Sequence, residues 1–123
     1  AYQPEHTRQV AISKAILSLA ENIDAVAVVA ETKSGATAQQ ISSYRPDVPV
    51  IAVTSDDRTA QQLALVYGVK SYVRPAHAEA AQRLTDWLLR HKILHKNDTV
   101  VTVSGKYPGR VGTTDTIKVR VLE

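Results

Sequence analysis

The stretch with the most chemical potential is a short polar segment between an apolar run and a predicted helix. A phosphate oxygen can accept hydrogen bonds from its hydroxyl groups and its lysine, and its glycine lets the backbone approach a ligand closely. A helix N-terminus adds N–H groups and the positive end of the helix dipole. We therefore predict a phosphate-binding loop, although small polar residues here are also typical of an ordinary capped turn. The loop consists of Thr32, Lys33, Ser34, Gly35, Ala36 and Thr37.

A second polar stretch, over residues 104–114, follows a later apolar run and contains Lys106, Arg110 and Gly112. Both stretches come directly after predicted strands, so they lie at the carboxyl edge of one sheet, where α/β proteins bind ligands. The two cations can close over an anion held by the first loop. The alternative is a solvated connection whose charges only keep it in solution.

Other kinds of site find little support in the residues. The first loop lacks the Gly-Lys-Ser/Thr ending of a Walker motif, and its single glycine does not make a dinucleotide fingerprint. The chain has no cysteine, and its four histidines lack a third ligand at suitable spacing, so we predict no metal site. With no nucleophile elbow or paired carboxylates, we also predict no catalytic residue.

Composition limits the class of protein. The chain has 123 residues, 44% hydrophobic and 22% charged, which is typical of one soluble domain. The net charge of +3 is spread along the sequence, so we expect no nucleic-acid partner. No apolar stretch is long enough to span a membrane, and the absence of cysteine suits a reducing compartment. We therefore expect a cytoplasmic protein.

Hydrophobic periodicity predicts alternating helices and strands. Apolar residues at spacings of three and four indicate amphipathic helices, and short continuous apolar runs indicate strands buried on both faces. Predicted helices cover 5–21, 36–44, 57–67 and 77–92, and predicted strands cover 25–30, 48–53, 69–73, 99–103 and 116–122.

These elements predict an α/β fold with three layers, in which helices cover both faces of a five-stranded mixed sheet. The connection over 104–115 is too short for a parallel crossover, so the last strand should be antiparallel. We expect one domain over 1–123, with a leading helix over 1–22 and an α/β core over 24–123.

Local signals also predict individual side-chain roles. Asp56 is the expected N-cap of the helix over 57–67, and Tyr67 should point inward from that helix. Gly68 should end the helix in the left-handed conformation. Trp87 is expected in the core rather than as an exposed stacking platform.

Three segments together resemble the C-terminal domain of pyruvate kinase. They are Thr32–Thr54, Asn97–Gly105 and Gly112–Thr116. The resemblance covers essentially the whole chain and implies the same five-stranded sheet with an antiparallel last strand. It also implies that this chain is not the catalyst, because that family transfers phosphate from phosphoenolpyruvate to ADP on a separate (β/α)₈ barrel. No cofactor is then expected here, since the family's Mg and K ions belong to the barrel.

The resemblance further implies a regulatory role. In that family this domain binds an effector, either a phosphorylated sugar or a nucleotide, and helps to build the tetramer. Thr32–Thr37 match the family's phosphate loop, and residues 105–112 match the loop that folds over the effector. The expected partners are therefore a phosphorylated small molecule, the catalytic barrel and further copies of the chain.

This sequence departs from the family pattern in two places. Ala36 stands where several members carry a longer polar or basic residue. The helix over 77–92 has no match to the Trp and Arg pair that grips a second phosphate in some eukaryotic members. A monophosphate site is therefore easier to defend than a site for fructose 1,6-bisphosphate.

A free-standing assembly module without an effector is the alternative function. The strand over 116–122, if it lies at a sheet edge, can pair with its copy across a two-fold axis. Lys118 and Arg120 on that strand count against such pairing, because charges at an edge often prevent it.

Overall fold

The structure is a computed structural model that describes residues 4–44, 46–105 and 114–123. Lys106, Arg110 and Gly112 lie outside the described residues. The elements run in the order α1 (Pro4–Asn22), β1 (Ala27–Glu31), α2 (Ala36–Ser43), β2 (Val50–Thr54), α3 (Asp57–Leu63), β3 (Val69–Val73), α4 (Ala80–Arg90), β4 (Thr99–Gly105) and β5 (Thr114–Val121).

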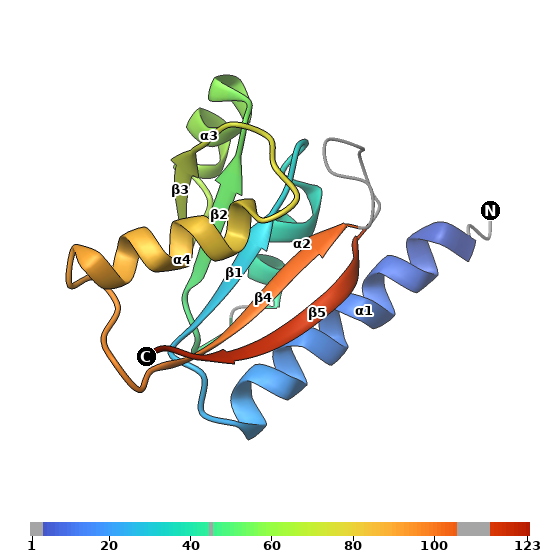
Figure 1. Cartoon of the computed structure of the whole chain (residues 1–123). Coiled ribbons are helices and arrows are strands. Elements are labelled where there is room, and N and C mark those ends of the chain that lie inside the picture. Colours follow the sequence, from blue (N-terminus) through green and yellow to red (C-terminus); the bar gives the residue numbers. More distant parts are fainter. Residues whose placement is uncertain (1–3, 45, 106–113) are drawn as a thin grey trace.

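The strands form one sheet in the order β3-β2-β1-β4-β5 (Figure 1). β1 pairs in parallel with β2 on one side and with β4 on the other, and β3 pairs in parallel with β2. β5 runs antiparallel to β4. The predicted mixed sheet and the antiparallel last strand are therefore confirmed.

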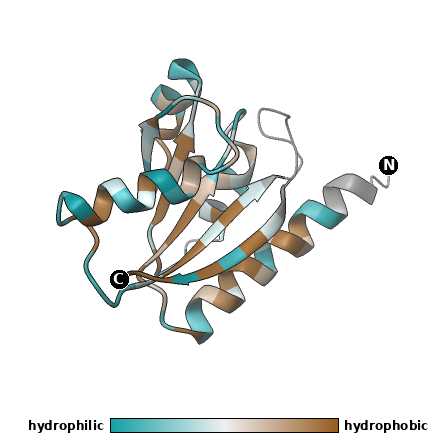
Figure 2. Ribbon diagram, in the orientation of Figure 1, coloured by the Kyte–Doolittle hydropathy of each residue, from teal (hydrophilic) through white to brown (hydrophobic). Residues whose placement is uncertain are grey.

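Helices cover both faces of the sheet, which confirms the three predicted layers. Buried residues of α1, α2 and α3 pack with Val28, Ala30 and Val101 on one face. Buried residues of α4 pack with Ala27 and Val29 on the other. Figure 2 shows the apolar residues of the central strands between these layers. β1 is apolar from Ala27 to Ala30 because both of its faces are buried there.

The strand order changes direction beside β1. From β1 the chain moves outward through β2 to β3, and then crosses the opposite face to place β4 on the other side of β1. The carboxyl ends of β1 and β4 therefore diverge into different connections at a topological switch point. Ligands of open α/β sheets bind in the crevice at such points.

The end of α3 differs from the prediction. Asp56 is the N-cap as expected, and its Oδ1 accepts a hydrogen bond from the Thr59 N–H at 3.0 Å. The helix stops at Leu63, however, and the side chain of Tyr67 is 69% exposed rather than inward. Val66 packs partly against the core after this early stop, because the chain must return to the sheet to begin β3. Gly68 has the expected positive φ of 74° but does not cap the helix.

Trp87 lies at the margin of the core rather than inside it. It is partly buried and packs against the cluster beneath α4. One face of its ring stacks on His91 with a centroid separation of 4.0 Å, and the Arg74 guanidinium lies 5.0 Å from its centroid. The expectation of a packing role is thus met only in part.

Candidate functional site

The predicted phosphate loop lies at the switch point. Residues 32–35 connect the end of β1 to the first turn of α2. The Thr32 N–H donates to the Val53 carbonyl at 2.9 Å, and the Gly35 carbonyl accepts the first α2 hydrogen bond from the Gln39 N–H at 2.9 Å. The loop is thus held at both ends by regular backbone hydrogen bonds.

Gly35 is the N-cap of α2 and has a φ of 85°, in the left-handed region that favours glycine. A Cβ at this position would lie 3.2 Å from Leu63 Cδ2 and 3.4 Å from Thr59 Cγ2. The residue type is therefore required twice, once by the backbone conformation and once by the close approach of α3. The glycine lets the loop pack tightly against α3.

Hydrogen bonds within the loop occupy two of the amides that were expected to face a ligand. The buried Gly35 N–H donates to Thr32 Oγ1 at 2.9 Å, and the exposed Ala36 N–H donates to Ser34 Oγ at 3.3 Å. The Lys33 carbonyl accepts a hydrogen bond from Thr59 Oγ1 at 2.8 Å. These bonds give the loop a defined shape before any ligand arrives.

The loop residues divide into two groups. Thr32, Gly35 and Thr37 are buried, whereas the side chains of Lys33, Ser34 and Ala36 are exposed. The first turn of α2 contains no acidic residue that would oppose an anion at its N-terminus. The chemistry open to solvent is therefore one ammonium group, one hydroxyl group and the positive end of a helix dipole.

The second predicted loop begins beside the first. β4 ends at Gly105, and Val103 of β4 is paired with Ala30 of β1. Residues 106–113 follow and lie outside the described ranges, so the predicted contribution of Lys106, Arg110 and Gly112 stays a prediction.

A polar cavity of about 160 Å³ lies on the α4 face of the sheet, and sequence reasoning missed it. It lies between the start of α4 and the strands β1, β4 and β5. Its polar lining includes Glu31, Thr102, Ser104, Gln82 and Lys118. The one sequence feature that could have indicated this cavity is Glu31. It is a charged residue that ends an otherwise apolar strand and directly precedes Thr32.

Glu31 is the unusual group in this cavity. Burial removes water from its carboxyl group and raises its pKa above the ordinary value of 4.5. Across the described part of the chain, no hydrogen-bond donor or cation lies within bonding distance of this carboxylate. The nearby Arg120 is engaged elsewhere, since its Nη2 lies 2.5 Å from Asp86 Oδ1.

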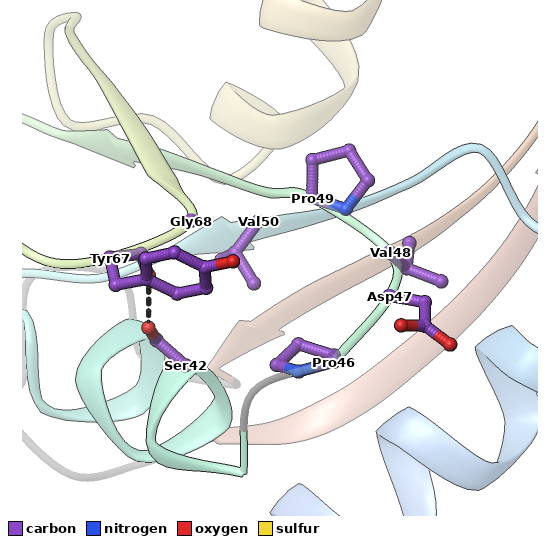
Figure 3. A pocket seen from close by; sticks show the side chains of 8 residues that line it. All are labelled: Ser42, Pro46, Asp47, Val48, Pro49, Val50, Tyr67 and Gly68. Carbon is purple, nitrogen blue, oxygen red and sulfur yellow. Dashed lines mark hydrogen bonds between the residues drawn. The ribbon is translucent and has the colours of Figure 1, made fainter.

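Another cavity, of about 190 Å³, lies at the opposite edge of the sheet (Figure 3). Its lining comes from the residues before β2 and β3, including Pro46, Asp47 and Tyr67. The Ser42 hydroxyl donates a hydrogen bond to the Tyr67 carbonyl there. This edge carries the amino ends of the parallel strands, whereas α/β folds bind ligands at the carboxyl ends. The 32–37 loop therefore remains the candidate site.

The described residues contain no group of three or more His, Cys, Asp or Glu side chains placed to hold a metal ion. Among the described helices, none is long and apolar enough to cross a bilayer.

The fold and its loop define an α/β domain with a candidate site at the switch point. The family model for the pyruvate kinase alpha/beta domain matches residues 10–120. The chain therefore belongs to this family, which confirms the resemblance seen in the sequence.

Similarity to individual pyruvate kinases agrees with this family assignment. The chain is 36% identical over 116 residues to pyruvate kinase 2 of Synechocystis, and 35% identical over 116 residues to the pyruvate kinase of Geobacillus stearothermophilus. These matches cover 92% and 91% of this chain but only 20% of each relative. A pyruvate kinase structure from Cryptosporidium parvum has the same fold, with a TM-score of 0.80 and 24% identity over 94% of this chain and 23% of that one. The chain thus spans about a fifth of its curated relatives.

Replacing Gly35 with alanine should destabilise the fold more than the same change at Gly68. Both positions have positive φ, which costs an alanine about 1–2 kcal/mol. At Gly35 the new Cβ also presses on Leu63, whereas at Gly68 it meets no atom within 4 Å. Urea unfolding should show an excess of about 1 kcal/mol for Gly35→Ala. Equal losses would contradict the close packing of the loop on α3.

Glu31→Gln should stabilise the protein at neutral pH. Because the folded state raises the pKa of Glu31 above 4.5, its native form holds the proton more tightly than the unfolded chain does. The wild-type free energy of unfolding therefore falls as pH rises through 4.5 and on through the folded-state pKa. Glutamine does not ionise, so its free energy of unfolding escapes this loss. The variant should therefore exceed the wild type in stability at pH 7 by more than it does at pH 4. Urea unfolding at both pH values tests this, and a variant that is less stable at pH 7 would refute it.

Proposed function

We propose that this chain is the regulatory, effector-binding and oligomerisation domain of a pyruvate kinase or a pyruvate kinase-like protein. The proposed effector is a phosphorylated metabolite held at Thr32–Thr37. The observation that carries the proposal is the position of this loop, which joins a central strand to a helix N-terminus at the switch point of a pyruvate kinase alpha/beta domain.

The exposed groups of the loop supply the contacts for a phosphate. The Lys33 ammonium and the Ser34 hydroxyl are open to solvent, and the dipole of α2 favours an anion beside them. The Gly35 amide stays with Thr32, since that bond is buried. The Ser34–Ala36 bond is exposed and 3.3 Å long, so a phosphate oxygen can take the place of the Ser34 hydroxyl on the Ala36 amide.

In this proposal the connection after β4 completes the site. It leaves β4 at Gly105, next to the strand that leads into the loop. Lys106 and Arg110 would add positive charge and Gly112 would let the backbone approach the ligand. Ordering of this connection would couple effector binding to the rest of an enzyme, a coupling typically worth about 1–3 kcal/mol.

Catalysis is assigned to the barrel, which this chain does not contain. The family's Mg and K ions are assigned there as well, and we expect no pyruvate kinase activity from this chain. The barrel and further copies of the domain are its proposed protein partners. The cytoplasmic location expected from the sequence belongs to the same proposal.

A second function, assembly without an effector, is favoured by the exposed face of β5. β5 is an edge strand, and its residues Ile117, Val119 and Val121 are 38%, 51% and 55% exposed. Val119 and Ile117 are paired with Val101 and Val103, so this stripe lies on the α1 face of the sheet. An apolar stripe beside an open edge suits pairing with a second copy. Such pairing would bury the apolar side chains and the unpaired backbone groups of the edge.

Effector binding predicts that Lys33→Gln weakens the affinity for fructose 6-phosphate. Loss of a charged hydrogen bond to phosphate costs roughly tenfold in Kd. Isothermal titration calorimetry on the 123-residue chain provides the measurement. Lys96→Gln is the matched control, because Lys96 is also exposed but precedes β4 at the opposite edge of the sheet. Equal affinities for the two variants, or no binding by the wild-type chain at millimolar concentrations, would contradict the proposed site.

Assembly through β5 predicts that Val119→Lys dissociates a dimer. Two ammonium groups would then meet at the centre of the paired strands and oppose contact. Sedimentation velocity should show dimers for the wild-type chain and monomers for the variant. Leu65→Lys is the control, since Leu65 is 90% exposed in the turn between α3 and β3, and β3 is at the opposite edge of the sheet from β5. A wild-type chain that stays monomeric at high concentration would remove this function for the chain alone.

A further inference from the structure

The edge strand β3 and the side of α4 next to it form a surface that combines aromatic rings with positive charges. Tyr72 of β3 meets Trp87 of α4 edge to face, with 5.8 Å between the ring centroids. The Arg74 guanidinium lies 5.0 Å from the Trp87 centroid, and the His91 ring at the C-cap of α4 stacks on Trp87 at 4.0 Å. We name this the β3–α4 surface, and it comprises Lys70, Tyr72, Arg74, Arg83, Trp87, Arg90 and His91.

Strand pairing places Lys70 on this surface. Lys70 is paired with Ile51 of β2, whose side chain packs in the cluster beneath α4. Side chains of directly paired residues point to the same face of a sheet. Tyr72, two residues further along β3, packs against the same cluster. The exposed Lys70 therefore points to the α4 face, beside Tyr72.

Helical spacing places two arginines there as well. Arg83 lies four residues before Trp87 and Arg90 lies three residues after it, and such spacings share one side of a helix. Because the Trp87 ring meets a ring of β3, both arginines lie on the β3 side of α4. The other side of the helix carries Asp86, which pairs with Arg120 of β5.

No carboxylate in the described part of the chain neutralises these cations, since the ion pairs formed there involve other residues. Lys70, Arg83 and Arg90 are all exposed. Arg83 and Arg90 lie two helical turns apart, which is roughly 10 Å along the axis. This spacing favours several linked phosphates over one phosphate ion, so the surface suits a polyanion.

We propose that the β3–α4 surface binds single-stranded nucleic acid. Backbone phosphates lie along Lys70, Arg83 and Arg90, and a base stacks on the exposed ring of His91. Histidine rings are stacking partners for unpaired bases, and Trp87 supports this ring from its other face. An acidic peptide would use the same cations but would gain no base stacking. The combination of charge and rings therefore favours nucleic acid.

The fold creates this surface from two separate segments, 70–74 and 83–91. The charge pattern along the chain therefore indicates no nucleic-acid partner, whereas the packing of β3 beside α4 brings the cations and the rings together. The inference is also independent of the proposed effector site, because none of residues 32–37 belongs to the β3–α4 surface.

The test uses a short oligothymidylate and an abasic strand of the same length, with polyglutamate of the same charge as a third probe. Trp87 is the only tryptophan in the chain, so its fluorescence reports binding next to His91. At low salt the wild-type chain should bind oligothymidylate with a change in this fluorescence, and should bind the abasic strand roughly tenfold more weakly. His91→Ala should abolish that difference while it still binds the abasic strand.

Arg90→Gln should weaken the binding of both strands roughly tenfold, because it removes a phosphate contact. Arg8→Gln is the matched control, since Arg8 is exposed on α1, which covers the opposite face of the sheet. Equal losses in these two variants would mean that net charge alone attracts the strand, and would overturn the proposal. Equal wild-type affinity for the two strands, or no binding of either, would overturn it too. Polyglutamate that binds as tightly as oligothymidylate would make an acidic peptide the partner instead.

Discussion

The central position of β1 is the constraint on which the rest of the molecule depends. This strand is hydrogen-bonded on both edges, to β2 and to β4, and is covered on both faces. Val28, Val29 and Ala30 are fully buried as a result. A strand held on four sides has little freedom, so the residues that follow it leave the sheet at a fixed place. The start of the loop over 32–35 is therefore positioned by the core.

The loop then adds its own rigidity. Gly35 takes a backbone conformation that other residues avoid, and its missing side chain lets the loop settle against Leu63 of α3. The hydroxyl groups of Thr32 and Ser34 satisfy the Gly35 and Ala36 amides. A site built in this way is preorganised, which lowers the entropy cost of binding. It also uses the Gly35 amide for structure, so in the proposed function the phosphate contacts come from the exposed Lys33, Ser34 and Ala36.

Much of this could be predicted from the sequence, because the controlling signals are local. The apolar run before Thr32 predicts a buried strand, and the short connection after β4 predicts an antiparallel partner. Asp56 caps α3 for reasons contained within four residues. The early end of α3, with Tyr67 exposed, depends on where the chain must rejoin the sheet, and helical spacing carries no information about that. Glu31 was missed for a similar reason, since its burial beside α4 follows from the sheet and its covering helix.

The central claim is that the exposed residues after β1 receive a phosphate group. Amide ¹H–¹⁵N spectra of the chain, titrated with fructose 6-phosphate, test it most directly, because each backbone amide reports its own surroundings. We expect saturable shifts at Lys33, Ser34 and Ala36, with little change at Asp47, Tyr67 and Gly68, which line the cavity on the opposite edge of the sheet. Shifts confined to that opposite edge, or no shifts at saturating ligand, would contradict it.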